Sequence, residues 1–334
     1  MDSYDFPLRQ SRYGDPGAVP ADLPAGPREL AALVRNLLIH REEGGRFGYA
    51  VPEERRHEDA EARYVGGILR VLRERGPAPL TVHRELGERF VGTCRDFALL
   101  LCAFLRATGT AARVRCGFAT YFGDGSFHED HWVTEYRPRN GGWRLADAQV
   151  TDGAYDVPFD PLDVPRDRFL VAGAGWRACR AGDADPDTFG IALPEEHLRG
   201  LWFVRGSVVR DLAALNGVEV LPWDAWGLAA KEEAEVTVDD LALLDEAARV
   251  TAAVAATASA PASAPASATP TVSRRSGACT RIPVSPSRPR SLRTRRTSVS
   301  GRSAFLGVPG AERRPLVEVQ KPLLAGFPVR PPPQ

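Results

Sequence analysis

One cysteine stands where a turn meets a strongly apolar segment. Cys94 lies in the string VGTCRDFALLLCAFLRATG, and the residues that follow it are apolar on every side, which is typical of a helix buried at the centre of a domain. A thiol at a helix N-terminus lies near the positive end of the helix dipole and near unpaired backbone N–H groups, and both favour the nucleophilic thiolate. Cys94 is therefore a candidate nucleophile. Such a residue needs a base that takes its proton and a third group that orients the base.

His131 and Asp147 are the candidates for those two roles. His131 begins the predicted strand HWVTEYR, and Asp147 lies near the end of the predicted strand WRLADAQ. A hairpin that turns between these strands pairs residues whose numbers sum to about 280, so it pairs Glu135 with Leu145. His131 and Asp147 then share one face as diagonal neighbours, within reach of a hydrogen bond. We expect this face to pack on the helix of Cys94, and a register shift of one residue would separate the pair.

The segments around these residues predict a buried helix followed by an antiparallel meander. Apolar residues at helical spacing indicate the helices, and apolar residues at every second position indicate the strands. The predicted elements are helices over residues 27–40, 57–75 and from Cys94 to Gly109, strands over 112–119, 131–137 and 143–149, and a last helix that opens at Thr237. Gly76 and Gly109 fit the ends of their helices, and Thr237 fits a helix cap.

The charge is unevenly divided along the chain. The 334 residues include 43 basic and 43 acidic ones, but residues 255–334 hold 13 of the basic and two of the acidic residues. That segment is rich in Arg, Ser and Pro and cannot bury enough apolar surface to fold. The predicted organisation is an irregular arm over 1–26, a domain over 27–254 with a core at 85–150 and an extension at 151–254, and a disordered basic tail over 255–334. The abrupt change fits either a natural tail or a frameshifted segment.

Neither secretion nor membrane spanning is indicated. The N-terminal string MDSYDFPLRQ has no apolar region, and no stretch approaches the roughly 18 apolar residues of a spanning helix. The five cysteines, at positions 94, 102, 116, 179 and 279, show no CxxC spacing. We therefore expect reduced thiols in a cytoplasmic protein, and neither a zinc cluster nor a disulfide framework.

Other charged motifs receive structural or non-specific interpretations. The run His128–His131 has the residue types of a metal site, but it enters a strand and no third ligand is apparent, so no metal or cofactor is predicted. Asp96 stands where an acid stabilises the first turn of a helix, and Arg95 could favour the thiolate of Cys94. A structural role is expected for both rather than a catalytic one. The basic tail has no interleaved aromatic residues and predicts only non-specific contact with nucleic acid. Nothing in the sequence sets the oligomeric state.

Three strings carry a resemblance to a known family. GTCRDFALLLCAFLRATGTAARVRCGF, DHWVTEYR and WRLADAQ resemble the core of the transglutaminase-like superfamily in its bacterial form, over about residues 85–150. The resemblance implies an α+β fold of the papain-like and transglutaminase-like cysteine-protease type. Such a fold has N-terminal helices, a central buried helix headed by the nucleophile, and an antiparallel sheet. It also implies a triad of Cys94 as nucleophile, His131 as base and Asp147 as orienting acid.

Two features depart from the family pattern. Many relatives have His-Ala-Trp-Val at the base, whereas this chain has Asp130-His131-Trp132-Val133. If Trp132 is aligned with the tryptophan of those relatives, the base position falls on Asp130. We prefer to align His131 with the base of the family, because Val133 and Glu135 then lie on the same face of the strand as His131. The second departure is that no side chain can be assigned as an oxyanion donor, although the Cys94 backbone N–H is a candidate.

The resemblance implies acyl chemistry on the amide of a protein or peptide. With water as the acceptor the protein would be a hydrolase, namely a protease, amidase or deamidase, and with an amine it would be a transglutaminase. The alternative is a catalytically inactive binding module that has kept the fold.

Overall fold

The computed structural model describes residues 14–17, 20, 22–139, 141–151, 153, 155–192 and 198–259, without the side chains of 254–259. All of them belong to one of the two units into which the chain divides, the unit that comprises Met1–Ala262 and Glu318–Gln334. The predictions for most of the N-terminal arm and for the tail beyond residue 259 concern residues outside this description. Within the described residues, no helix combines the length and the apolar character needed to cross a membrane.

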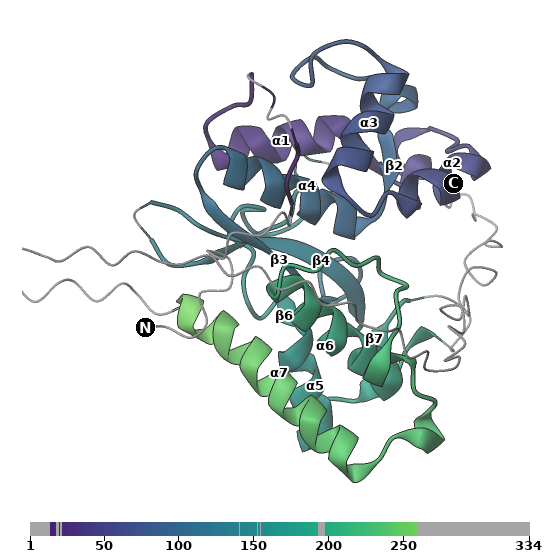
Figure 1. Ribbon diagram of the computed structural model, residues 1–334, viewed down its shortest axis with the longest axis vertical. Coiled ribbons are helices and arrows are strands. Elements are labelled where there is room, and N and C mark those ends of the chain that lie inside the picture. Colours follow the sequence, from purple (N-terminus) through teal and green to yellow (C-terminus); the bar gives the residue numbers. More distant parts are fainter. Residues whose placement is uncertain are drawn as a thin grey trace, which may run out of the picture. The chain divides into compact units, whose positions relative to one another are not determined.

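Helices and strands are mixed along the chain (Figure 1). The helices are α1 (Pro27–Leu37), α2 (Glu53–Glu58), α3 (Val65–Arg75), α4 (Cys94–Ala107), α5 (Ala172–Ala181), α6 (Leu201–Leu215) and α7 (Val238–Ser259). The strands are β1 (Leu38–His40), β2 (Phe90–Gly92), β3 (Ala111–Ala119), β4 (His128–Arg137), β5 (Arg144–Ala146), β6 (Phe169–Val171) and β7 (Phe189–Gly190). This content is compatible with the predicted α+β class. The last helix follows Thr237 as predicted and extends past residue 254.

The main sheet is an antiparallel meander with the predicted register. Its strand order is β5-β4-β3-β6, and β7 adds a short parallel pairing to β4. Glu135 pairs with Leu145, which confirms the predicted hairpin alignment. The strands differ in length from the prediction, because β4 begins three residues earlier, at His128, and β5 ends at Ala146. On the edge of β4 that carries β5 and β7, residues 130–133 are therefore left without a partner strand among the described residues.

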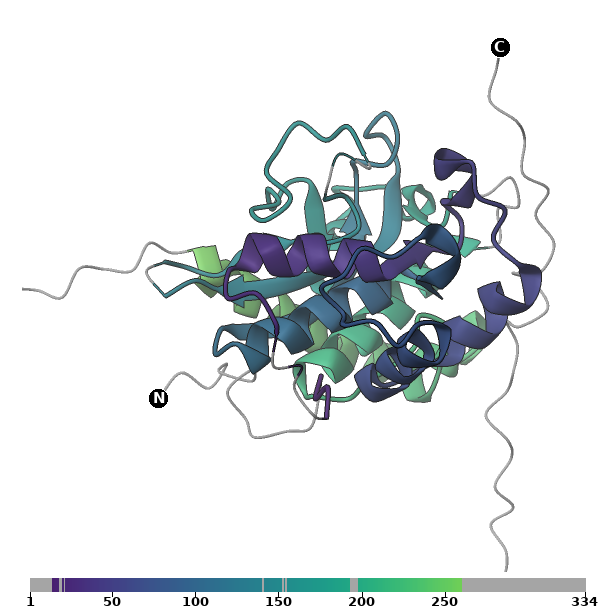
Figure 2. The ribbon, with the colours of Figure 1, turned by 90° about the horizontal axis from the view of Figure 1, so that it is seen from above.

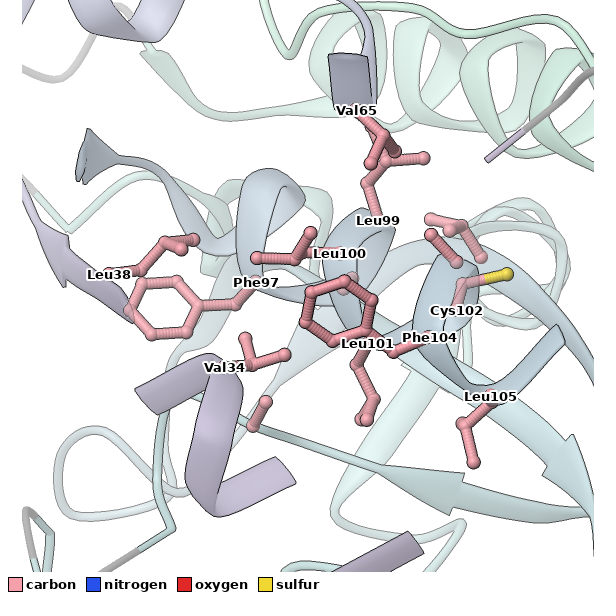
Figure 3. Packing of buried hydrophobic residues seen from close by; sticks show 14 of the residues in the cluster. Val34, Leu38, Val65, Phe97, Leu99, Leu100, Leu101, Cys102, Phe104 and Leu105 are labelled. Atoms are coloured by element: carbon pink, nitrogen blue, oxygen red, sulfur yellow. The ribbon is translucent and has the colours of Figure 1, made fainter. Parts of the chain in front are cut away.

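Helix α4 is buried all round, as its composition predicts. Every residue from Cys94 to Leu105 is buried. Helix α1 lies alongside it (Figure 2), and β3 and β4 pack against another side. Figure 3 shows its side chains packed among Val34 and Leu38 from one segment and Val65 from another, all in one apolar core. This burial fixes the position of the helix N-terminus and hence of the cysteine.

The first predicted helix ends earlier than expected. It was predicted to run to about His40, but α1 ends at Leu37 and the next three residues form β1. Strand β1 runs parallel to β2, and His40 pairs with Gly92. Leu38 and Ile39 are fully buried in this pairing, so tertiary contacts override the local helical pattern.

The second predicted helix, over residues 57–75, is broken. Helix α3 covers only its second half and is followed by Gly76 as predicted, while Asp59 lies in a separate 3-10 turn. The Asp59 carboxylate is buried and accepts hydrogen bonds from Arg75 at 2.6 Å and from the Val91 N–H at 2.8 Å. The break turns this carboxylate toward β2 and so anchors the segment that leads into Cys94.

A buried ion network joins the sheet to the later helices. Arg115 on β3 is fully buried, and its Nη1 lies 3.0 Å from Glu135 of β4. Its Nη2 lies 2.8 Å from Asp211 of α6 and donates to the carbonyl of Thr251 in α7 at 2.9 Å. A buried charge is tolerated only when it is paired in this way.

Glu135 is the shared carboxylate of this network. Besides Arg115, it accepts hydrogen bonds from Arg113 at 2.6 Å and from Arg166 at 2.8 Å. Burial alone would raise the pKa of Glu135, but Arg113, Arg115 and Arg166 together lower it from 4.5 to about 2. The ionised carboxylate therefore stabilises the folded protein.

We expect Glu135→Gln to lower the free energy of unfolding at pH 7 by about 3–5 kcal/mol, because it removes the buried negative charge that Arg113, Arg115 and Arg166 share. The folded pKa lies below the unfolded value, so the carboxylate contributes its full stabilisation above pH 4.5 and loses it as the pH falls toward 2. Urea unfolding at pH 7 and pH 3 measures both effects, and the difference between variant and wild type should shrink at pH 3.

The matched control for this prediction is Glu74→Gln. Glu74 is exposed and pairs only with Arg70 one helical turn away. Its loss should change the unfolding free energy by no more than about 0.5 kcal/mol. Equal losses in the two variants would contradict the role assigned to the network.

Candidate active site

Cys94 is the first residue of α4 and is only 8% exposed. A capping box closes the start of the helix, in which the Thr93 N–H donates to Asp96 Oδ2 at 2.8 Å. Arg95 pairs with the other oxygen of Asp96 at 2.9 Å. Arg95 and Asp96 thus hold the helix start, in agreement with the structural role predicted for them.

His131 and Asp147 are in direct contact. His131 Nε2 lies 2.7 Å from Asp147 Oδ2. The Tyr121 hydroxyl donates to the same oxygen at 2.7 Å, and the Gln149 N–H donates to Asp147 Oδ1 at 2.9 Å. Asp147 is therefore held by three donors. Because Nε2 of His131 is engaged, Nδ1 is the ring nitrogen left to exchange a proton.

Aromatic rings surround the imidazole of His131. The ring centroid of Phe122 lies 4.8 Å away, that of Tyr121 5.8 Å and that of Phe169 6.3 Å. His131 is only 2% exposed as a result. Such an enclosure excludes water and strengthens the electrostatic interactions of the ring.

The face of β4 that packs on α4 is not the one predicted. Thr134 Oγ1 donates to the carbonyl of Ala98 in α4 at 2.8 Å, and Trp132 lies in the core that contains α4. His131 and Val133 occupy the opposite face, where Val133 packs in another core with residues of β5 and β6. Side chains alternate along a strand, so the fit of Trp132 against the helix turns His131 away from it.

The thiol instead meets the site at the edge of β4. Strand β5 pairs with β4 at Thr134–Tyr136 and β7 pairs with it at His128–Glu129, so residues 130–133 are open on this edge. Strand β3 pairs along the opposite edge from Glu129 to Arg137. The N–H of Trp132 on the open edge donates a hydrogen bond to the sulfur of Cys94. From this edge the thiol interacts electrostatically with Asp130 on one face and with Asp147 on the other. Cys94 thus belongs to the same cluster as the imidazole–carboxylate pair.

The resting form of Cys94 is the thiol, contrary to the expectation from its helix position. Burial raises its pKa well above the usual value, and the negative charges of Asp130, Asp147 and Asp96 raise it further. The hydrogen bond from the Trp132 N–H acts in the opposite direction but is outweighed. Tertiary surroundings therefore override the local effect of the helix N-terminus.

Asp130 lies on the other flank of the thiol. It shares the face of Trp132, and its Oδ1 is buried without a hydrogen-bond partner among the described residues. Burial raises the pKa of Asp130 to about 6, while Arg210 and His131 oppose the shift. The alternative alignment, which puts the base position at Asp130, thus also points to a residue beside Cys94.

The histidines of the run His128–His131 do not face the same side of β4, as a shared metal site would require. His128 stacks on Phe189 with ring centroids 4.0 Å apart, and it lies on the opposite face of β4 from His131. Across the part of the chain that the structure describes, no three His, Cys, Asp or Glu side chains are arranged to hold a metal ion.

Tyr121 and Gln149 were not identified from the sequence. Tyr121 lies two residues after the end of β3, and Gln149 lies two residues after Asp147. Neither position has a spacing that predicts contact with Asp147, because each contact depends on how the chain turns after its strand ends. An aromatic residue just beyond the end of a core strand is the signal that could have drawn attention to Tyr121.

Comparison with known proteins agrees with this segment of the chain. The family model of the transglutaminase-like superfamily matches residues 81–148, which include Cys94, His131 and Asp147. This segment is therefore transglutaminase-like, as the sequence resemblance predicts. No curated protein and no solved structure matches the chain.

We expect Asp130→Asn to lower the pKa of Cys94, because Asp130 contributes the largest of the charge effects that raise it. The rate of iodoacetamide labelling against pH, with the Cys94 peptide quantified by mass spectrometry, should then rise at lower pH than in the wild type. Asp124→Asn, in an exposed turn, is the control. A labelling profile that does not move in Asp130→Asn, or that moves equally in the control, would show that Asp130 does not act on the thiol.

Proposed function

We propose that this protein is a cysteine-dependent enzyme that transfers or hydrolyses the acyl group of an amide in a protein or peptide. Cys94 acts as the nucleophile, His131 as the base and Asp147 as the orienting acid. The observation that carries the proposal is the 2.7 Å contact between His131 Nε2 and Asp147 Oδ2 beside a buried cysteine, within the transglutaminase-like segment. A cytoplasmic location is part of the proposal, since the cysteines of the described residues are free thiols.

The first half of the reaction forms an acyl-enzyme. The Cys94 proton moves to His131 Nδ1 as the sulfur attacks the carbonyl carbon, because the buried thiol does not ionise on its own. Asp147 holds the ring and stabilises the imidazolium that forms. His131 then returns the proton to the leaving nitrogen, and ammonia or an amine departs.

The second half depends on the acceptor. His131 takes a proton from water in hydrolysis or from an amine in transamidation, and the acceptor displaces Cys94 from the acyl carbon. The imidazole of His131 is surrounded by the rings of Tyr121, Phe122 and Phe169. Any acceptor must therefore approach next to aromatic rings, which suits an acceptor with apolar groups beside its nucleophilic atom.

A non-catalytic binding module is the competing function. The observation in its favour is the low exposure of Cys94 together with its raised pKa, since both make the thiol unreactive at rest. A binding module would keep the packing of α4 and the polar contacts of Asp147 without forming any covalent adduct.

Acyl-enzyme formation separates the two functions. We expect a mixture of acetylated Gln- and Asn-containing peptides to yield a thioester on Cys94, seen by mass spectrometry, with release of ammonia. Cys94→Ala should abolish the adduct, and His131→Ala or Asp147→Asn should slow its formation by about 10²–10⁴-fold. Added methylamine in the same assay reports whether an amine competes with water.

Cys179→Ala is the control in this experiment, because Cys179 lies on α5, outside the cluster around Cys94. It should keep the wild-type rate. If the wild type forms no adduct on Cys94 and releases no ammonia, the enzymatic proposal is wrong and the binding module is favoured. If Cys94→Ala releases ammonia as fast as the wild type, the role of Cys94 as the nucleophile is wrong.

A further inference from the structure

His40 ends β1 close to the start of the nucleophile helix. It pairs with Gly92 in the parallel β1–β2 sheet, and Gly92 precedes Cys94 by two residues. The next residue, Arg41, donates its N–H to the carbonyl of Gly92 at 2.9 Å, and its guanidinium interacts electrostatically with Cys94. Because the two strands run side by side in the same direction, this short segment stays beside the chain as it enters α4.

The ring of His40 has one nitrogen engaged and one available. The Glu42 N–H donates to His40 Nδ1 at 3.2 Å, so Nδ1 is an acceptor. A neutral imidazole that accepts at Nδ1 must carry its proton on Nε2. Nε2 has no hydrogen-bond partner among the described residues, and the residue is partly exposed. The ring therefore offers one N–H to whatever occupies the space beside it.

His40 stays neutral over the working pH range of proteins. Burial lowers its pKa from 6.5 to about 3, and electrostatic interactions with Arg41, His131, Arg35 and Arg56 contribute to the lowering. The interaction with His131 also shows that the two rings belong to one electrostatic cluster. A neutral imidazole can donate a hydrogen bond without acting as an acid or a base.

The Cys94 backbone N–H is a second donor, two residues after the Gly92 that pairs with His40. It is the first amide of α4, and the capping box engages Asp96 and Thr93 rather than Cys94. Cys94 donates no backbone hydrogen bond to the loops and turns of the described residues. Two N–H donors beside a nucleophile are the groups that can stabilise an oxyanion.

We propose that the Nε2–H of His40 and the backbone N–H of Cys94 together hold the oxyanion of the reaction, an inference that rests on the proposed acyl chemistry. When the Cys94 sulfur bonds to the carbonyl carbon, the π electrons of the C=O bond move to oxygen and the thiol proton moves to His131. The oxygen then accepts both N–H hydrogen bonds. When the carbon–nitrogen bond breaks, the electron pair returns to form the thioester carbonyl and the proton leaves with the amine.

Acylation by p-nitrophenyl acetate tests the assignment without knowledge of the natural substrate, because this ester passes through the same tetrahedral oxyanion and leaves an acetyl group on Cys94. We expect His40→Ala to lower kcat for acylation by about 10²–10³-fold with little change in KM. His40→Gln should recover part of the loss, because its amide N–H can donate. His83→Ala, at an exposed histidine, should match the wild type.

Alkylation by iodoacetamide is the second measurement on the same variants. This reaction displaces iodide and forms no oxyanion, so His40→Ala should alkylate Cys94 at the wild-type rate if it is folded and only the oxyanion donor is lost. A variant that loses both reactions equally, or that keeps full acylation, overturns the assignment of His40. Absence of an acetylated Cys94 in the wild type would instead overturn the acyl chemistry itself.

Discussion

The buried guanidinium of Arg115 fixes the position of helices α6 and α7 against the main sheet. Arg115 lies between Glu135 of β4 and Asp211 of α6 and also donates to the carbonyl of Thr251 in α7. An unpaired charge at this depth would cost several kcal/mol, so both carboxylates must come to it. The network also fixes the register of β3 and β4. Glu135 pairs with Arg113 across the strands. A register shift of one residue would turn the Glu135 carboxylate toward the opposite face of the sheet, which packs on α4.

The same constraint decides how the candidate site is built. His131 lies four residues before Glu135 on one strand, so the face that carries the ion network also carries the imidazole. Trp132 then faces α4, and Cys94 can approach the imidazole only around the edge that β5 leaves open. The three residues proposed as a triad thus come together at a strand edge and not across a sheet face. This arrangement explains why the thiol interacts with Asp130 and Asp147, which lie on different faces.

Features that depend on neighbouring residues could be predicted from the sequence, and features that depend on distant contacts could not. The hairpin register and the burial of α4 follow from local patterns, and the structure has both. The strand at His40 depends on pairing with Gly92, which is distant in sequence, so a local helical pattern misleads there. Which face of β4 meets α4 was equally beyond a periodicity argument, because both faces carry apolar residues. The pKa of Cys94 has the same origin, since burial and carboxylates from three segments outweigh the helix N-terminus.

The protonated Cys94 thiol, surrounded by carboxylates, suits the proposed chemistry if no free thiolate forms before the attack. The surroundings that disfavour the thiolate also disfavour an isolated oxyanion, so attack must deliver the negative charge directly to donors. His40 meets that need because its Nε2–H is available and its low pKa keeps it neutral. At the same moment His131 gains a proton next to Asp147, and the carboxylate that opposed the thiolate now stabilises the imidazolium. In the proposed reaction, proton transfer and attack are therefore coupled by the same electrostatics that keep Cys94 a thiol at rest.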